Sequence, residues 1–144
     1  MPNSRVPRLY FENTAARLLQ DPNGFLRVRW SANTRRLEET QAVFTHMRLA
    51  LGRFNWSRIL VDQRVMPPFT AAEQQWIAQH WLPLAVQEGG YRHGAVVVSA
   101  EVMVRLATSY ITTQVLGLPL VYRSFEAEAE AVQWLLSQPV APAA

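Results

Sequence analysis

Apolar and polar residues alternate with two different periods along this chain, and the first runs have the period of strands. Residues 25–30 alternate Leu, Val and Trp with Phe and two arginines, as in a strand with one buried face. Residues 8–12 and 15–20 are shorter apolar runs, which we interpret as two edge strands. The sequence Asp-Pro-Asn-Gly at residues 21–24 is typical of a tight turn and predicts a hairpin.

From about Thr34 onward the apolar residues recur at intervals of three and four, which is the period of an amphipathic helix. Asn33 or Thr34 can cap the start of this helix, and Gly52 can end it. A second helix is predicted to start at Thr70, because Thr70 and Glu73 form the T-x-x-E pattern of a capping box.

Pro83 lies inside the pattern of this second helix and predicts a kink or an early end. Residues 58–62 and 94–98 are too apolar to face water and are predicted to form buried strands. Ser99 can cap a third helix, which Gly117 ends. The positions of this helix expected to face inward are Met103, Val104, Ala107, Ile111 and Val115.

Residues 118–122 are predicted to form the last strand, and a final helix follows, whose apolar side chains include Ala131, Trp134 and Leu135. Three strands therefore come first, and helices and strands then alternate. Strands joined through a helix run parallel, with right-handed connections.

We therefore predict an α/β fold with a mixed, mainly parallel sheet of about six strands flanked by four helices. One domain is expected over residues 1–144, because no linker long enough to separate two domains is present. Its core is expected over residues 8–137, and a disordered tail over residues 139–144.

Composition and charge limit the kinds of catalytic chemistry that this chain can carry out. Cysteine is absent and all 14 basic residues are arginine, which excludes thiolate chemistry, Schiff-base catalysis and a P-loop lysine. Residues 1–64 carry 11 arginines and 5 acidic residues, whereas residues 65–144 carry 3 arginines and 6 acidic residues. Three explanations are compatible with this uneven distribution of charge: the charges are simply solvated, the protein binds an acidic partner, or it self-associates head to tail.

The chain shows no pattern for a membrane, a metal or a nucleic acid. No apolar run approaches the roughly 18 residues of a membrane span, and the N-terminus has no apolar stretch like that of a signal peptide, so we expect a cytoplasmic protein. The arginines are scattered and the net charge is +3, which argues against nucleic acid as a partner. The histidines have no metal-binding spacing and no catalytic triad pattern is present. We expect no metal, no cofactor and no enzymatic activity.

Four stretches of the chain carry local patterns that are informative through their order and spacing. They are Trp30 with the polar turn after it, residues 59–64, residues 76–83, and Phe125 with residues 131–135. Together they resemble the STAS-like domain family, the SpoIIAA-like proteins related to anti-sigma-factor antagonists. The resemblance spans roughly residues 8–137, nearly the whole chain, and implies a mixed sheet flanked by helices.

In the anti-sigma-factor antagonists, the phosphorylation switch is a serine that follows an aspartate at the start of a helix beside the sheet. The resemblance implies that such a switch would lie at the matching residues of this chain. The matching residues here, 62–70, contain no serine, and Thr70 is the only hydroxyl residue among them. Thr70 can accept a phosphate at the helix N-terminus or simply cap the helix, and its capping box favours the cap.

Asp62 is a candidate for ligand binding because it ends a predicted central strand. In open α/β sheets, ligands bind at the carboxyl ends of the strands. Arg64, Ser99 and Thr70 are expected on the same rim, which predicts a site for a small anionic or polar ligand. The alternative is that Asp62 accepts bonds from loop amides or pairs with an arginine.

Pro68, Phe69 and Trp76 predict an apolar patch for a protein partner or a second copy of the chain. Trp76 and Trp81 are five residues apart on one helix and therefore point to different sides. Either one of them is exposed in the patch, or both cover the rim of the sheet.

The expected function is a STAS-like, non-enzymatic regulatory or protein-interaction module that self-associates. The alternative is a carrier of a small apolar ligand or lipid, with a pocket between the sheet and the second or third helix. The residues expected to line that pocket are Met66, Phe69, Met103 and Leu106. An enzyme would need a pocket in which Asp62, Arg64 and a histidine converge.

Overall fold

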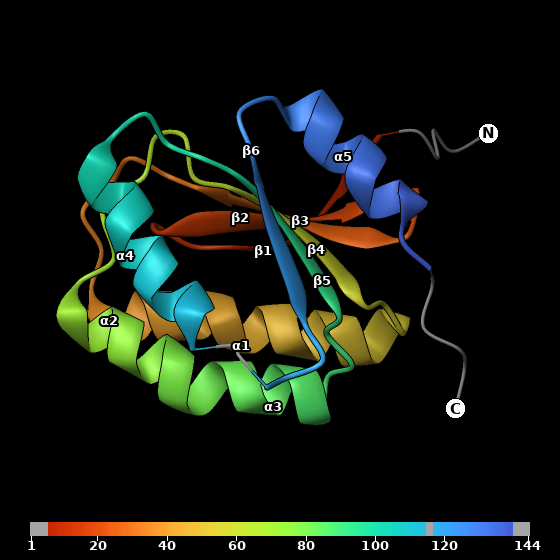
Figure 1. The fold of residues 1–144 in the computed structure, drawn as a ribbon, viewed down its shortest axis with the longest axis horizontal. Coiled ribbons are helices and arrows are strands. Elements are labelled where there is room, and N and C mark those ends of the chain that lie inside the picture. The colour runs from red at the N-terminus through yellow and green to blue at the C-terminus, as the bar shows by residue number, and fades with distance from the viewer. Residues whose placement is uncertain (1–5, 115–116, 140–144) are drawn as a thin grey trace.

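The computed structural model describes residues 6–114 and 117–139. These residues form a six-stranded sheet in which the strands lie side by side in the order of the sequence (Figure 1). The strands are β1 (Arg8–Glu12), β2 (Ala16–Asp21), β3 (Phe25–Trp30), β4 (Arg58–Asp62), β5 (His93–Val97) and β6 (Val121–Phe125). β1, β2 and β3 pair antiparallel, and β3 to β6 pair parallel. The α/β class and the mixed, mainly parallel sheet are confirmed.

The helices cover both faces of the sheet. They are α1 (Leu37–Phe54), the continuous series α2 (Ala71–Trp76), η1 (Ile77–Trp81) and α3 (Leu82–Gln87), then α4 (Val102–Thr113) and α5 (Glu128–Ser137). Each of the first three helical connections joins a strand to its next neighbour in the same direction. Because such crossovers are right-handed, these helices lie on one face of the sheet. α5 follows the last strand and packs on the other face, against β4, β5 and β6 (Figure 1).

Two apolar cores result from the alternation of side chains along the strands. Ile59 and Val61 of β4 face the larger core beneath α1 to α4, whereas Leu60 faces the smaller core beneath α5. β4 is therefore buried on both faces, as its uninterrupted apolar sequence predicts. No helix in the described ranges has the length and hydropathy needed to cross a membrane.

α1 differs from its predicted boundaries at both ends. It begins at Leu37 rather than near Asn33, and the carboxylate of Glu39 accepts the Arg36 N–H at 2.8 Å in its first turn. Gly52 does not end the helix, which continues to Phe54. The end comes at Asn55, whose φ of 57° is left-handed, a conformation that asparagine tolerates better than most residues.

Pro83 does not end the second helical segment. Immediately before it, Ile77–Trp81 widen into a π turn, in which the Leu82 N–H donates to the Ile77 carbonyl. A proline removes one donor and crowds the preceding turn, and a π turn accommodates both effects without breaking the helix. The segment therefore continues through α3 to Gln87.

The last strand lies three residues later than predicted. β6 spans Val121–Phe125 rather than residues 118–122, and Arg123 lies opposite Ala95 of β5. Pro119 cannot donate to a sheet ladder, so the chain turns before pairing begins. Residues 140–144 of the predicted tail lie outside the described residues.

The orientation of α4 also departs from prediction. Val104, Ala107 and Ile111 are buried as expected, but Met103 is 63% exposed. Val115 lies outside the described residues. The buried face of α4 is narrow because α4 packs mainly against α2 and η1 rather than against the strands.

Candidate functional site

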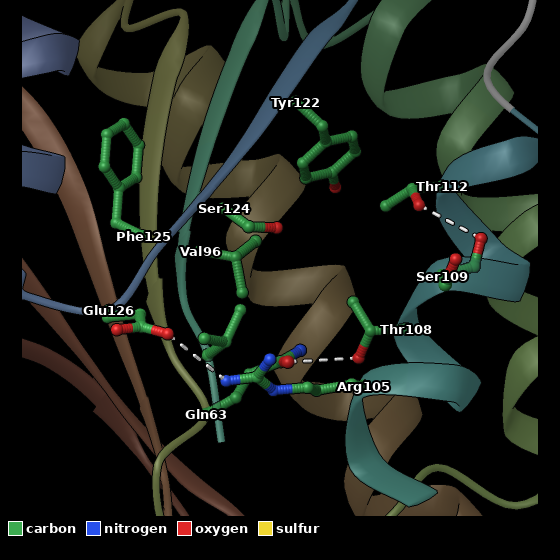
Figure 2. Close-up of a pocket in the computed structure, with 11 residues that line it drawn as sticks. Gln63, Val96, Arg105, Thr108, Ser109, Thr112, Tyr122, Ser124, Phe125 and Glu126 are labelled. Carbon is green, nitrogen blue, oxygen red and sulfur yellow. Dashed lines mark hydrogen bonds and ion pairs between the residues drawn. The ribbon is translucent and has the colours of Figure 1, made fainter. Parts of the chain in front are cut away.

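A cavity of about 640 Å³ lies between α4 and the carboxyl ends of β5 and β6. We call it the α4 pocket (Figure 2). Its lining residues are Gln63, Val96, Val98, Arg105, Thr108, Ser109, Thr112, Tyr122, Ser124, Phe125 and Glu126. This is the sheet edge at which open α/β folds bind ligands. The sequence placed its candidate ligand residues at this same edge, around Asp62.

The pocket has an apolar floor and a hydroxyl-rich wall. β5 contributes Val96 to the floor, and Val98 follows it just after the strand. The wall is formed by side chains of α4 and β6 that carry hydroxyl groups: Thr108, Ser109, Thr112, Tyr122 and Ser124. Thr112 lies four residues after Thr108 and three after Ser109, so these α4 side chains share one face of the helix.

Gln63 is the most buried polar group of the pocket, with 4% of its surface exposed. It follows β4 directly, and its backbone N–H donates to the Val97 carbonyl at 3.0 Å. Its side-chain Oε1 accepts the Thr108 hydroxyl at 3.0 Å, and among the described residues its Nε2 has no partner. The sequence analysis missed Gln63, although its place after a central strand was the available signal.

Gly94 determines where the Tyr122 ring lies. The two residues are paired in the β5–β6 register, and a Cβ at Gly94 would come within 2.5 Å of Cε1 of Tyr122. Without that Cβ, the Tyr122 ring lies against the backbone and directs its hydroxyl into the pocket (Figure 2). Burial raises the pKa of Tyr122 to about 12, so this hydroxyl keeps its proton at neutral pH.

Two charged side chains mark the exposed rim of the pocket. Arg105 is 47% exposed and Glu126 88% exposed at the side chain, and their charged groups lie 3.9 Å apart. Arg105 also donates through Nε to the Ser99 carbonyl. The rim therefore carries one charge of each sign, held loosely in solvent.

Asp62 and Arg64 bind each other instead of lining the pocket. Two hydrogen bonds of 3.0 and 2.7 Å join the Arg64 guanidinium to the Asp62 carboxylate, which also accepts the Arg64 backbone N–H. Burial tends to raise the pKa of Asp62, but the bonds from Arg64 outweigh it and lower that pKa. Arg64 further contacts Glu128 of α5 at 3.3 Å. This is the arginine pairing that the sequence left as the alternative.

Ser99 and Thr70 act locally. The Ser99 hydroxyl accepts the Glu101 N–H at 3.0 Å, just before α4, and Ser99 reaches the pocket only through Arg105. Thr70 and Glu73 form the predicted capping box, with bonds of 3.1 and 2.7 Å. The structure therefore does not bring Thr70 or Ser99 together with Asp62 in one rim.

The predicted patch of Pro68, Phe69 and Trp76 is not an exposed surface. Phe69 is only 5% exposed and packs edge-on against Trp30, with the ring centroids 5.3 Å apart. Trp81 is also buried, while Trp76 and Pro68 are half-buried. These residues do not form an exposed patch because Arg35 draws the loop inward by donating to the carbonyls of Pro67 and Pro68.

No metal-binding cluster forms within the described ranges. No group of three His, Asp or Glu residues there could hold a metal ion. The half-buried His93 stacks edge-on with Trp134 at 5.9 Å, and His46 stacks on Phe11 at 3.8 Å. The histidines, Asp62 and Arg64 are absent from the lining of the α4 pocket.

Comparison of the chain with family models, with curated proteins and with solved structures gave no match. Nothing in those comparisons indicates an enzymatic activity. The geometry of the α4 pocket is therefore the main basis for a functional proposal.

Proposed function

We propose that this protein is a non-enzymatic regulatory module that binds a small molecule in the α4 pocket. The observation that carries the proposal is a cavity of about 640 Å³ at the carboxyl edge of the parallel strands. Sites for small molecules have volumes of roughly 300–1,000 Å³ and combine an apolar lining with a few placed polar groups. The α4 pocket meets both conditions.

α4 connects the α4 pocket to the protein surface, so ligand binding can change that surface. Its inner side carries Thr108 and Thr112 at the pocket, so an occupant contacts the helix directly. Its outer side is exposed and apolar. A ligand that favours one position of α4 would therefore change the surface that a partner meets.

The expected carrier of an apolar ligand is less well supported. Met66 and Phe69 are buried in the larger core, whereas Met103 and Leu106 are exposed on the outer face of α4. None of these four residues lines the α4 pocket. An aliphatic chain in this pocket would leave Gln63 and the wall hydroxyls without partners, which is costly.

Filling the pocket tests the proposal. We would titrate ¹⁵N-labelled protein with a mixture of soluble sugars, polyols, amino acids, nucleosides and short fatty acids, and follow the amide signals of the pocket. Binding should shift Gln63, Thr108 and Ser124, and Ser124→Phe should abolish the shifts by occupying the cavity. Ser137→Phe, on the exposed end of α5, is the matched control. Unchanged signals with every probe, or shifts that survive Ser124→Phe, would refute the proposal.

A second candidate function is self-association through the outer face of α4. Four large apolar side chains on this helix are half exposed or more: Val102, Met103, Leu106 and Tyr110. β6 is the end strand of the sheet among the described residues. Antiparallel pairing of two β6 edges and packing of two α4 helices are compatible with one two-fold axis, which favours a second copy as the occupant.

Light scattering over a range of concentrations tests this candidate. Leu106→Glu should shift a dimer toward monomer, whereas Leu49→Glu, at a similarly exposed position on α1, should not. A monomer at all concentrations would contradict it.

The STAS-like assignment and a cytoplasmic location belong to the same proposal. The mixed sheet with helices on both faces supports the first. The absence of cysteine supports the second.

A further inference from the structure

The threonines and the glutamine of the α4 pocket have fixed hydrogen-bonding roles. Thr108 donates its hydroxyl proton to Gln63, and Thr112 donates its proton to the Ser109 carbonyl at 3.0 Å. Both threonine oxygens can therefore only accept a bond from an occupant. The Gln63 Nε2 has no partner among the described residues and can only donate.

The remaining hydroxyls of the α4 pocket can both donate and accept hydrogen bonds. Among the described residues, the side-chain hydroxyls of Ser109 and Ser124 make no hydrogen bond, and the Tyr122 hydroxyl points into the same space (Figure 2). A hydroxyl rotates to donate or accept as its partner requires. An occupant that satisfies this wall must itself combine donors and acceptors, as a hydroxyl group does.

Charge argues against an ionised occupant. The pocket interior offers no full charge, because Arg105 and Glu126 lie on the exposed rim with opposite signs. An anion near Arg105 would also meet Glu126 and the threonine lone pairs, and a cation near Glu126 would also meet Arg105 and the Gln63 amide hydrogens. Transfer of an unpaired ion from water to such a site is unfavourable.

The floor supplies the complementary apolar surface. Val96 and Val98 lie beneath the wall, and the Tyr122 ring presents a flat face beside its hydroxyl. The C–H faces of a cyclic polyol or a sugar ring are apolar, while the ring edge is covered with hydroxyls. We infer that the α4 pocket takes a small, uncharged, polyhydroxylated molecule of the monosaccharide or cyclic polyol class. This inference rests on the proposed function and specifies its ligand class.

The test compares neutral polyols with charged and apolar probes. myo-Inositol, D-ribose and D-glucose would be titrated against labelled full-length protein, together with D-gluconate, D-glucosamine and decanoate. At least one neutral polyol should shift the amides of Gln63, Thr108 and Ser124, and bind at least about tenfold more tightly than the charged or apolar probes.

Two neighbouring threonines of α4 provide a matched pair of variants. Thr112 lines the pocket, whereas Thr113 is exposed and its hydroxyl makes the same kind of bond, to the Tyr110 carbonyl at 2.7 Å. Thr112→Val should weaken polyol binding by about three- to tenfold, the effect of one lost hydrogen bond. Thr113→Val should leave it unchanged.

The outcomes separate this inference from the proposed function. Tighter binding of gluconate, glucosamine or decanoate in the pocket would overturn the ligand class and leave a small-molecule site in place. Shifts with none of the probes would overturn both. Equal effects of Thr112→Val and Thr113→Val would show that the polyol binds elsewhere, which also overturns the inference.

Discussion

Arg35 joins two helix starts and the proline loop through one buried side chain. Its guanidinium binds both carboxylate oxygens of Glu73, at 2.8 and 3.0 Å, and donates to the carbonyls of Pro67 and Pro68. It also lies over the ring of Phe69 at 5.3 Å. The planar guanidinium suits this role, because it offers five donors in a fixed geometry that matches a carboxylate.

We expect Arg35→Ala to destabilise the protein strongly. The variant leaves the Glu73 carboxylate buried without its counter-charge, which costs about 3–5 kcal/mol. Arg36→Ala is the control, since Arg36 is 82% exposed at the side chain and its pair with Glu39 is a surface ion pair, which contributes little to stability. Urea unfolding of both variants measures the difference. Similar losses for the two would show that the buried network contributes little.

Gly94 offers a second test at the residue scale. We expect Gly94→Ala to lower the free energy of unfolding by about 1–3 kcal/mol, because its Cβ would overlap the ring of Tyr122 and the hydroxyl of Tyr91. Gly52→Ala should instead stabilise the protein by up to about 1 kcal/mol, because nothing lies within 4 Å of a Cβ on that helical residue. Equal effects on the unfolding midpoint would contradict the close packing at β5.

At the scale of elements, α5 is held by polar contacts as well as by its apolar side. Arg58 of β4 donates to the Leu135 carbonyl at 3.2 Å, and Arg27 of β3 contacts Glu128 at 3.3 Å. His93 of β5 packs edge-on against Trp134, and its Nδ1 is buried without a partner among the described residues. Burial and the neighbouring Arg58 lower the pKa of His93 below its ordinary value of 6.5.

The docking of α5 should therefore depend on pH. As the pH falls from 6.5 toward the lower folded-state pKa of His93, the unfolded chain binds more protons than the folded chain, so the free energy of unfolding decreases. His93→Gln should remove this slope, whereas His80→Gln, at an exposed position, should keep it.

The lowered pKa values of Asp62 and Glu73 act at more acidic pH, below their ordinary values of 3.8 and 4.5. Denaturant unfolding at closely spaced pH values distinguishes the two ranges. A slope near pH 6 that survives in His93→Gln would rule out His93 as its source.

At the scale of the whole molecule, burial is uneven across the sheet. β4 is enclosed between both cores, whereas every residue of β6 is exposed or half-buried, and no strand lies beyond it among the described residues. Opening β4 requires disruption of both helical layers, whereas opening β6 exposes much less apolar surface.

We expect hydrogen exchange to follow this gradient. The amides of β4 and β5 should exchange most slowly, by global unfolding, and those of β6 and α4 much faster, by local opening. A ligand in the α4 pocket should slow exchange in α4 and β6 selectively. Equal protection of α4 and β4 in the free protein would contradict the gradient.

Local pattern was sufficient for the order of elements. The period-two alternation at residues 25–30, the apolar run at 58–62 and the capping box at Thr70 each predicted the element that forms there. These signals are local, because a strand or the start of a helix depends on residues that are close together in the sequence. Boundaries were less accurate: Asn55 rather than Gly52 ends α1, and pairing with β5 sets the limits of β6.

Tertiary structure decided which residues meet. Gln63 and Thr108 are 45 positions apart, and Arg35 and Glu73 are 38 apart, so no local pattern could pair them. Helical period alone could not tell which side of α4 faces the sheet, because both sides carry apolar residues, and the structure buries Ala107 but exposes Leu106. The sequence alone therefore determined the α/β sheet. The packing of α4 against α2 and η1, which no local pattern encodes, determined which side of α4 is buried and where the α4 pocket lies.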